Sequence, residues 1–103
     1  MPAMKAASMI THKDVDRRLF RLVRACVVRI DKDPKLLDRA RIQAARYSNA
    51  PLRQEWQHLL GLPWPQLRVV LLEESDEGDR IRQSAPFGGF LSNERRMRIL
   101  KSR

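Results

Sequence analysis

Residues 12–31 read HKDVDRRLFRLVRACVVRID, and this stretch decides the class of fold. Its apolar residues recur at spacings of three and four, at Val15, Leu19, Leu22, Val23, Cys26, Val27 and Ile30. Such spacing places them on one face of an amphipathic helix. Thr11 precedes the run, and Asp14 lies three positions after Thr11. This pair is a variant of the capping box. The sequence therefore predicts a long first helix over residues 12–31.

Prolines and a glycine divide the rest of the chain into shorter helices. Asp33-Pro34 favours a helix start, with aspartate as the cap and proline at the first position. Pro51 can open a third helix that ends at Gly61, and Pro65 can open a fourth. A regular helix is disfavoured before Pro63 and Pro65, so the segment between them is expected to connect two helices.

The segment after Pro65 leaves two alternatives open. Val69–Leu72 suits a buried strand, although its helical neighbours favour a helix. Ser75 either caps a short helix that runs through Ile81 or lies within a continuous fourth helix. Residues 84–90, SAPFGGF, are typical of a loop because of the proline and the paired glycines. Ser92 is expected to cap a final helix.

These signals together predict an all-α fold. We expect a single small domain of about five helices, packed as an irregular bundle over residues 11–103 and ending in a basic tail. Residues 1–10 have no strong pattern and are expected to form a flexible N-terminal segment. No signal peptide and no apolar run of membrane-spanning length is apparent, so a cytoplasmic location is expected.

The 103 residues carry a net charge of +9, which favours an anionic partner. Arginines gather on one face of the first helix and at the C-terminal end. One hypothesis is therefore a small basic DNA- or RNA-binding regulator that uses Arg17, Arg21, Arg24, Arg95, Arg96, Arg98 and Lys101. The acidic run Glu73, Glu74, Asp76, Glu77 and Asp79 is interpreted as a solvated helix face or a surface for a basic partner.

Catalysis and cofactor binding have little support in the sequence. The chain has one cysteine and two histidines, without CxxC or HExxH spacing, so we expect neither a metal site nor a cofactor. Cys26 lies on the apolar face of the first helix and is interpreted as a core residue. No nucleophile–base pair can be assembled, and we predict that the chain is not an enzyme.

The C-terminal half has a pattern that points to a family. Trp64, Leu67 and Val70-Leu71-Leu72 are followed by Glu74-Ser75, by RIRQSAPF at residues 80–87, by GFLS at 89–92 and by ERR at 94–96. Over residues 51–98 this pattern resembles short bacterial proteins encoded in toxin–antitoxin or abortive-infection-type loci. Such genes lie beside a larger toxin gene, with a nucleotidyltransferase as one candidate toxin.

The resemblance implies an antitoxin-like protein that neutralises a cognate toxin by direct contact, with operator DNA as a further possible partner. For this function the predicted contact residues are Arg80, Arg82, Gln83, Ser84, Pro86 and Phe87. We expect Arg82 to pair with acidic groups and Phe87 to fill a pocket.

Overall fold

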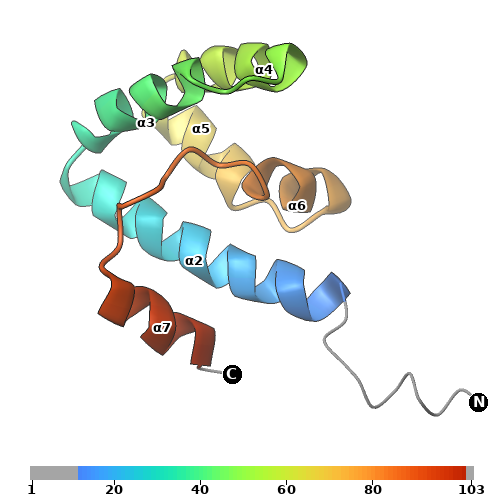
Figure 1. Ribbon diagram of the computed structural model, residues 1–103, viewed down its shortest axis with the longest axis vertical. Helices are drawn as coiled ribbons and strands as arrows, with labels where there is room; N and C mark the ends of the chain where they lie inside the picture. The colour runs from blue at the N-terminus through green and yellow to red at the C-terminus, as the bar shows by residue number, and fades with distance from the viewer. Residues whose placement is uncertain (1–11, 102–103) are drawn as a thin grey trace, which may run out of the picture.

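The computed structural model describes residues 12–101, and in that range the chain forms six α-helices and no strand (Figure 1). The helices are α2 (His12–Lys32), α3 (Leu36–Ala45), α4 (Ala50–Leu60), α5 (Trp64–Leu71), α6 (Asp76–Arg82) and α7 (Asn93–Lys101). The predicted all-α class is confirmed, and the number of helices is close to the expected five. The predicted Thr11 cap and the segment 1–10 lie outside the described residues.

The two alternatives left open after Pro65 are now resolved. Val69–Leu72 is helical, because α5 runs to Leu71 and Leu72 is its C-cap. A separate helix α6 then begins at Asp76, and the Ser75 side chain accepts a hydrogen bond from the backbone N–H of Gly78 at 3.0 Å. Ser92 caps α7 in the same way, accepting from the N–H of Arg95 at 3.1 Å. Local capping chemistry therefore sets both helix starts.

The start of α3 differs from the prediction. Asp33 does accept a hydrogen bond from the N–H of Lys35, but the regular helix begins only at Leu36. The N–H groups of Leu36 and Leu37 bond to carbonyls three residues earlier, so a tighter turn precedes the helix. The next helix is capped by Asn49, whose side chain accepts from the N–H of Leu52 at 3.0 Å.

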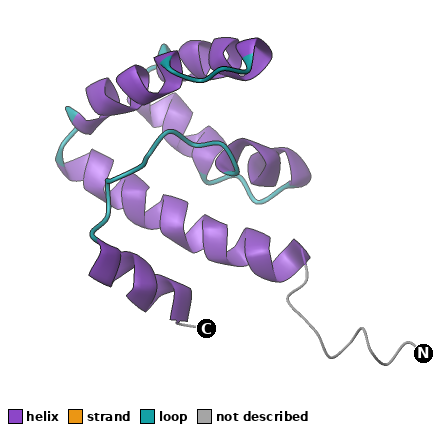
Figure 2. Cartoon of the chain, viewed as in Figure 1, coloured by secondary structure: helices purple, strands orange, loops and turns teal. Residues whose placement is uncertain are grey.

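The long helix α2 is the centre of the molecule, with α5, α6 and α7 packed against it (Figure 1). Helices α3 and α4 pack against each other; α3 follows the C-terminal end of α2, and the pair lies on the opposite side of α2 from α7 (Figure 1). The loop 83–92 crosses between this pair and α2 on its way to α7 (Figure 2). The buried core draws on every helix except α7, and on the loop through Phe87, Phe90 and Leu91.

The apolar face of α2 is covered unevenly along its length. Its C-terminal half is buried, with Val27 and Ile30 fully enclosed. Toward the N-terminus Leu19 and Leu22 are only half-buried, and Val15 is 48% exposed. The predicted face is therefore correct, but other helices cover only part of it.

A charged clamp joins the C-terminal end of α2 to α5. The Asp31 carboxylate accepts hydrogen bonds from the Trp64 indole N–H at 2.8 Å and from Arg68 Nε at 3.1 Å. The Arg68 guanidinium, followed by the Trp64 indole, lowers the pKa of Asp31 below its ordinary value. The clamp is partly exposed, so its contribution to stability is small at neutral pH and is lost as acid protonates Asp31.

Gly78 is required where α6 packs against the preceding turn. A Cβ atom added there would lie 2.0 Å from the carbonyl oxygen of Glu73. We expect Gly78→Ala to lower the free energy of unfolding by about 2–3 kcal/mol, because the backbone overlap outweighs the gain of about 1 kcal/mol in helix propensity. Urea denaturation measures the change.

Gly61→Ala is the matched control for this substitution. An added Cβ at Gly61 would meet only backbone oxygens at 3.4 and 3.5 Å, which is ordinary contact. Its effect on stability should be small. Equal effects of the two substitutions would show that the packing at Gly78 is not as tight as described.

Candidate interaction groove

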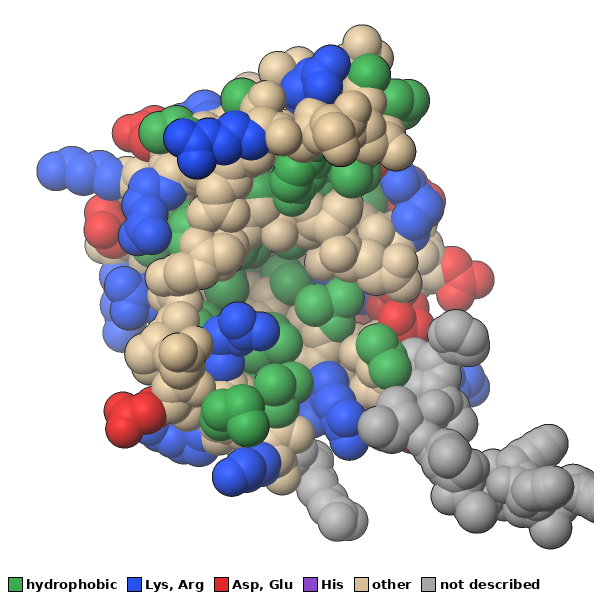
Figure 3. Space-filling model, in the orientation of Figure 1, with side chains coloured by type: hydrophobic (Ala, Val, Ile, Leu, Met, Phe, Trp, Pro, Cys, Tyr) green, Lys and Arg blue, Asp and Glu red, His purple; other side chains and the backbone are tan. Residues whose placement is uncertain are grey.

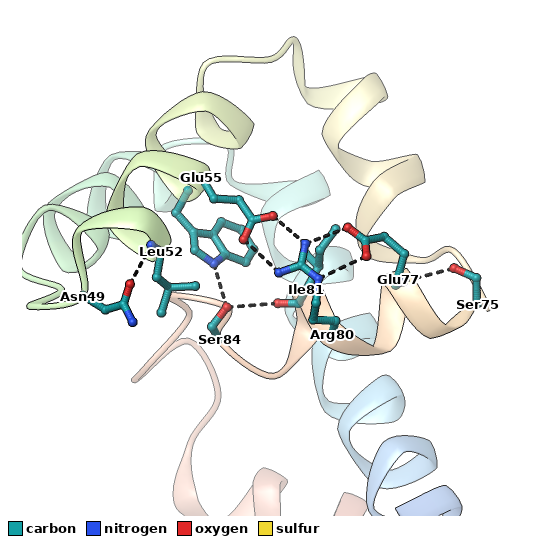
Figure 4. Close-up of polar contacts among 10 residues, drawn as sticks. Asn49, Leu52, Glu55, Ser75, Glu77, Arg80, Ile81 and Ser84 are labelled. Atoms are coloured by element: carbon teal, nitrogen blue, oxygen red, sulfur yellow. Dashed lines mark hydrogen bonds and ion pairs between the residues drawn. The ribbon is translucent and has the colours of Figure 1, made fainter.

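The loop 83–92 is held in place by Ser84, which bonds to a side chain of α4 and to one that follows α3. The Tyr47 hydroxyl, two residues beyond the end of α3, donates to the Ser84 carbonyl. The indole N–H of Trp56 in α4 donates to Ser84 Oγ at 2.8 Å (Figure 4). Because Trp56 is buried and Tyr47 packs against the core, the start of the loop has a fixed position.

Aromatic rings that pack into the core hold the middle of the loop in place. Phe87 stacks on Phe90 with ring centroids 5.2 Å apart, and it meets the edge of Trp56 at 6.3 Å. Phe87, Phe90 and the preceding Pro86 are all buried. The loop therefore contributes part of the hydrophobic core and has a defined conformation.

The tip of the loop is fastened to α3 by polar contacts. The Gln43 side-chain amide donates to the Gly88 carbonyl at 2.8 Å and accepts from the Gly88 N–H at 3.0 Å. The following Gly89 has φ of 81°, a left-handed conformation that glycine adopts at little cost. The guanidinium of Arg39 lies over the Phe90 ring at 5.5 Å. Together these contacts fix the chain reversal at the paired glycines.

Arg82 is buried at the junction of three helices. Its Nη1 donates to the carbonyls of Leu71 and Glu73 at 2.9 and 2.7 Å, and its Nη2 donates to Asp79 Oδ1 at 2.6 Å. The guanidinium also lies over the ring of Phe20 in α2, 4.8 Å from the centroid. The sequence predicts that Arg82 pairs with acidic groups of a partner, whereas in the structure its guanidinium is already paired with Asp79 of the same helix.

Arg80, two residues earlier, has the opposite environment. Its guanidinium lies between Glu55 of α4 and Glu77 of α6, at 2.6 Å from each carboxylate (Figure 4). Its side chain is 49% exposed, against 1% for Arg82. Hydrogen bonds to Glu77 and then to Glu55 raise the pKa of Arg80, so it stays charged at any working pH. Two carboxylates of the acidic segment, on Glu77 and Asp79, are therefore occupied by arginines of the same helix.

An open groove lies between α2 and the loop 83–92. It has a volume of about 190 Å³. Its walls are formed by Leu19, Leu22, Val23 and Cys26 of α2, by Arg82, Gln83, Ala85, Phe87, Gly88, Gly89 and Leu91, and by Arg96 of α7. Figure 3 shows this face, where hydrophobic side chains lie in a central recess with Lys and Arg side chains nearby. The groove lies over the part of the α2 apolar face that is only half-buried, at Leu19 and Leu22.

Three of the predicted contact residues line this groove, namely Arg82, Gln83 and Phe87. Of the three, Gln83 is exposed, whereas Arg82 and Phe87 are buried and contribute mainly to the walls. The other three do not line the groove. Ser84 anchors the loop through hydrogen bonds, Pro86 is buried, and Arg80 lies in the network with Glu55 and Glu77. Sequence reasoning missed Leu19, Leu22 and Ala85 as groove residues, because it placed Leu19 and Leu22 only on the apolar face of the first helix and could not tell which element covers that face.

Three arginines of α2 and α7 come together in another open hollow. It is lined by Arg21, Arg24, Ala25, Val28, Arg95 and Ile99. The structure therefore brings together two parts of the predicted nucleic-acid surface that are some 70 positions apart in the sequence. Of the remaining members of that set, Arg17, Arg96, Arg98 and Lys101 are exposed, and Arg17 lies 3.7 Å from Asp14.

Cys26 lies at the groove wall with its thiol protonated. Burial raises the pKa of Cys26 to about 11, while the nearby charges of Arg96, Arg29 and Arg95 oppose the rise. Within residues 12–101, no three His, Cys, Asp or Glu side chains gather closely enough to hold a metal ion. The same range contains no helix with both the length and the apolar character needed to cross a bilayer.

Comparisons with protein-family models, curated proteins and solved structures gave no match to this chain. The toxin–antitoxin resemblance therefore stays a prediction, and the geometry of the groove must carry the argument for function.

Substitution of the two neighbouring arginines by methionine tests their different roles. Arg82→Met leaves the carbonyls of Leu71 and Glu73 without their donor in a buried place, so we expect a loss of about 2–4 kcal/mol in the free energy of unfolding. Arg80→Met exposes two carboxylates that water can solvate, and its effect should be much smaller. Chemical denaturation of both variants measures the difference, and equal losses would contradict the assignment of Arg82 as the buried anchor.

The raised pKa of Cys26 predicts slow reaction with thiol reagents. At pH 7.5 a pKa of about 11 leaves only roughly one thiol in three thousand ionised, and the thiolate is the reactive form. The labelling rate of the folded protein should keep rising with pH beyond 9, and unfolding in urea should accelerate labelling strongly at neutral pH. A plateau near pH 8.5 in the folded protein would show that burial does not control this thiol.

Proposed function

We propose that this protein is a non-catalytic protein-binding module that acts by direct contact with a larger partner. The observation that carries the proposal is the open groove beside Leu19 and Leu22, which exposes apolar surface between rigid walls. Concave, partly apolar surfaces with a few polar groups at their edge are the form that binding sites commonly take. The walls are already positioned by Ser84, Gln43 and the stacked phenylalanines, so little ordering is needed on binding.

The partner class in this proposal comes from the sequence resemblance. Proteins with a similar C-terminal pattern belong to bacterial toxin–antitoxin or abortive-infection-type loci, so the proposed partner is a cognate toxin, with a nucleotidyltransferase-type toxin as one candidate. The protein would be an antitoxin-like inhibitor in the bacterial cytoplasm.

In this proposal the predicted contact residues have two different roles. Gln83 is exposed at the groove and is free to touch a partner, whereas Arg82, Pro86 and Phe87 would act by shaping the surface. Phe87→Ala removes a core side chain, so weaker partner binding by this variant would not identify a contact. Tests of the interface therefore need substitutions that leave the core intact.

One specific observation favours a second candidate, a nucleic-acid-binding regulator. Arg21, Arg24 and Arg95 line one hollow between α2 and α7, although they are distant in the sequence. Clustered arginines on one face suit contact with phosphates. The two functions are compatible, since an antitoxin-like protein can also bind its operator.

A pull-down from the native organism at moderate salt separates the two candidates. We expect one stoichiometric protein partner that remains bound after nuclease treatment, because the proposed contact is between proteins. Co-expression of the chain with that partner should restore growth of cells that the partner alone inhibits. Recovery of nucleic acid alone, lost on nuclease treatment and weakening steeply with salt, would favour the regulator.

A further inference from the structure

The groove walls combine apolar surface with positive charge and lack negative charge. Of the twelve lining residues, none is an aspartate or glutamate, and two are arginines, Arg82 and Arg96. Arg82 is already paired with Asp79, whereas Arg96 is exposed at the rim. An anionic group beside the groove would therefore meet Arg96 without any repulsion from the walls.

Within the part of the chain that the structure describes, the cations of α7 are not neutralised by ion pairs. By contrast, four arginines of α3, α5 and α6 are paired with carboxylates at 3.1 Å or less, namely Arg41, Arg68, Arg80 and Arg82. Among residues 12–101, no ion pair involves Arg95, Arg96, Arg98 or Lys101 of α7. The charges of Arg96, Arg29 and Arg95 also act on the thiol of Cys26, lowering its pKa against the effect of burial. The field inside the groove is thus positive.

We infer that the groove binds an acidic segment of a protein, which inserts one large apolar side chain between Leu22 and Ala85 and places its carboxylates beside Arg96. The inference rests on the proposed protein-binding function and specifies the chemistry of the partner. A volume of about 190 Å³ suits one such side chain, since an engineered protein cavity of roughly 150 Å³ holds a benzene molecule.

The same walls do not suit a nucleic acid. Proteins that take up single-stranded bases stack them on accessible aromatic rings. Here Phe87 and Phe90 are stacked on each other and buried, so the groove offers no free aromatic face. Its floor is aliphatic, formed by Leu19, Leu22 and Val23, which fits an aliphatic or phenyl side chain.

The test uses a fluorescein-labelled peptide with one phenylalanine between pairs of glutamates, measured by fluorescence anisotropy with the full chain. We expect saturable binding that weakens about tenfold or more when serine replaces the phenylalanine, because the apolar side chain supplies the burial. A peptide with lysines in place of the glutamates should not bind. No saturable binding of the acidic peptide up to about 1 mM overturns the inference.

Two substitutions at the groove have matched controls at the C-terminal end of α3, at Ala45 and at the C-cap residue Arg46. Ala85→Leu fills the groove and should weaken the peptide about tenfold, whereas Ala45→Leu adds the same atoms to an exposed position outside it. Arg96→Glu reverses the rim charge and should weaken the peptide about fivefold, with Arg46→Glu as the control of equal charge change. Circular dichroism melting verifies that all four variants fold. Equal affinities for groove and control variants would overturn the inference.

Further outcomes separate this inference from the proposed function. A stable protein partner that binds the wild-type, Ala85→Leu and Arg96→Glu chains equally would refute the groove as its site and leave protein binding intact. Peptide binding at the groove without any protein partner in cells would support the groove chemistry and count against the antitoxin-like role. Duplex DNA or RNA that displaces the peptide and binds Ala85→Leu unchanged would assign this face to nucleic acid.

Discussion

The placement of Arg82 is the constraint on which the rest of the structure depends. A buried guanidinium is costly unless its donors are satisfied. Here two backbone carbonyls and Asp79 accept from Nη1 and Nη2 of Arg82, whereas its Nε is buried without a hydrogen-bond partner among residues 12–101. The carbonyls of Leu71 and Glu73 lie at and just beyond the C-terminal end of α5, where the helix dipole favours a cation. The Phe20 ring adds a face from α2. One side chain thus joins α5, α6 and α2, and Gly78 permits the close approach that this junction needs.

The groove follows from this junction, because the loop 83–92 begins at the next residue. Arg82 fixes where α6 ends, Ser84 is then tied to Tyr47 and Trp56, and Gln43 holds Gly88 at the far side. The loop is consequently held at a distance from α2 and leaves the half-buried leucines open. Most of the predicted contact residues belong to this supporting structure, so their substitution changes the surface indirectly. A rigid groove of this kind loses little conformational entropy when a ligand enters.

Features set by neighbouring residues could be predicted from the sequence, and those set by distant residues could not. The apolar period of α2 and the caps at Ser75 and Ser92 are local signals, and the structure contains all three. The pairing of Arg82 with Asp79 spans three residues, so helix geometry could have suggested it. In contrast, Arg80 and Arg82 look alike in sequence, and only the packing of α6 against α2 and α5 buries one and exposes the other.

Charge pairing makes the net charge of +9 act unevenly over the molecule. The acidic residues after α5 are close to Arg80 and Arg82 and neutralise them, so the region around α6 contributes little net field. Helix α7 has a single acidic residue, Glu94, beside four cations. It has no buried residue and packs against α2, with Ile99 partly buried against the core. The unpaired charge therefore borders the groove and can steer an acidic partner toward it before contact. Because the groove floor is apolar, steering and final binding would depend on different forces, and salt would slow association more than it weakens the buried contact.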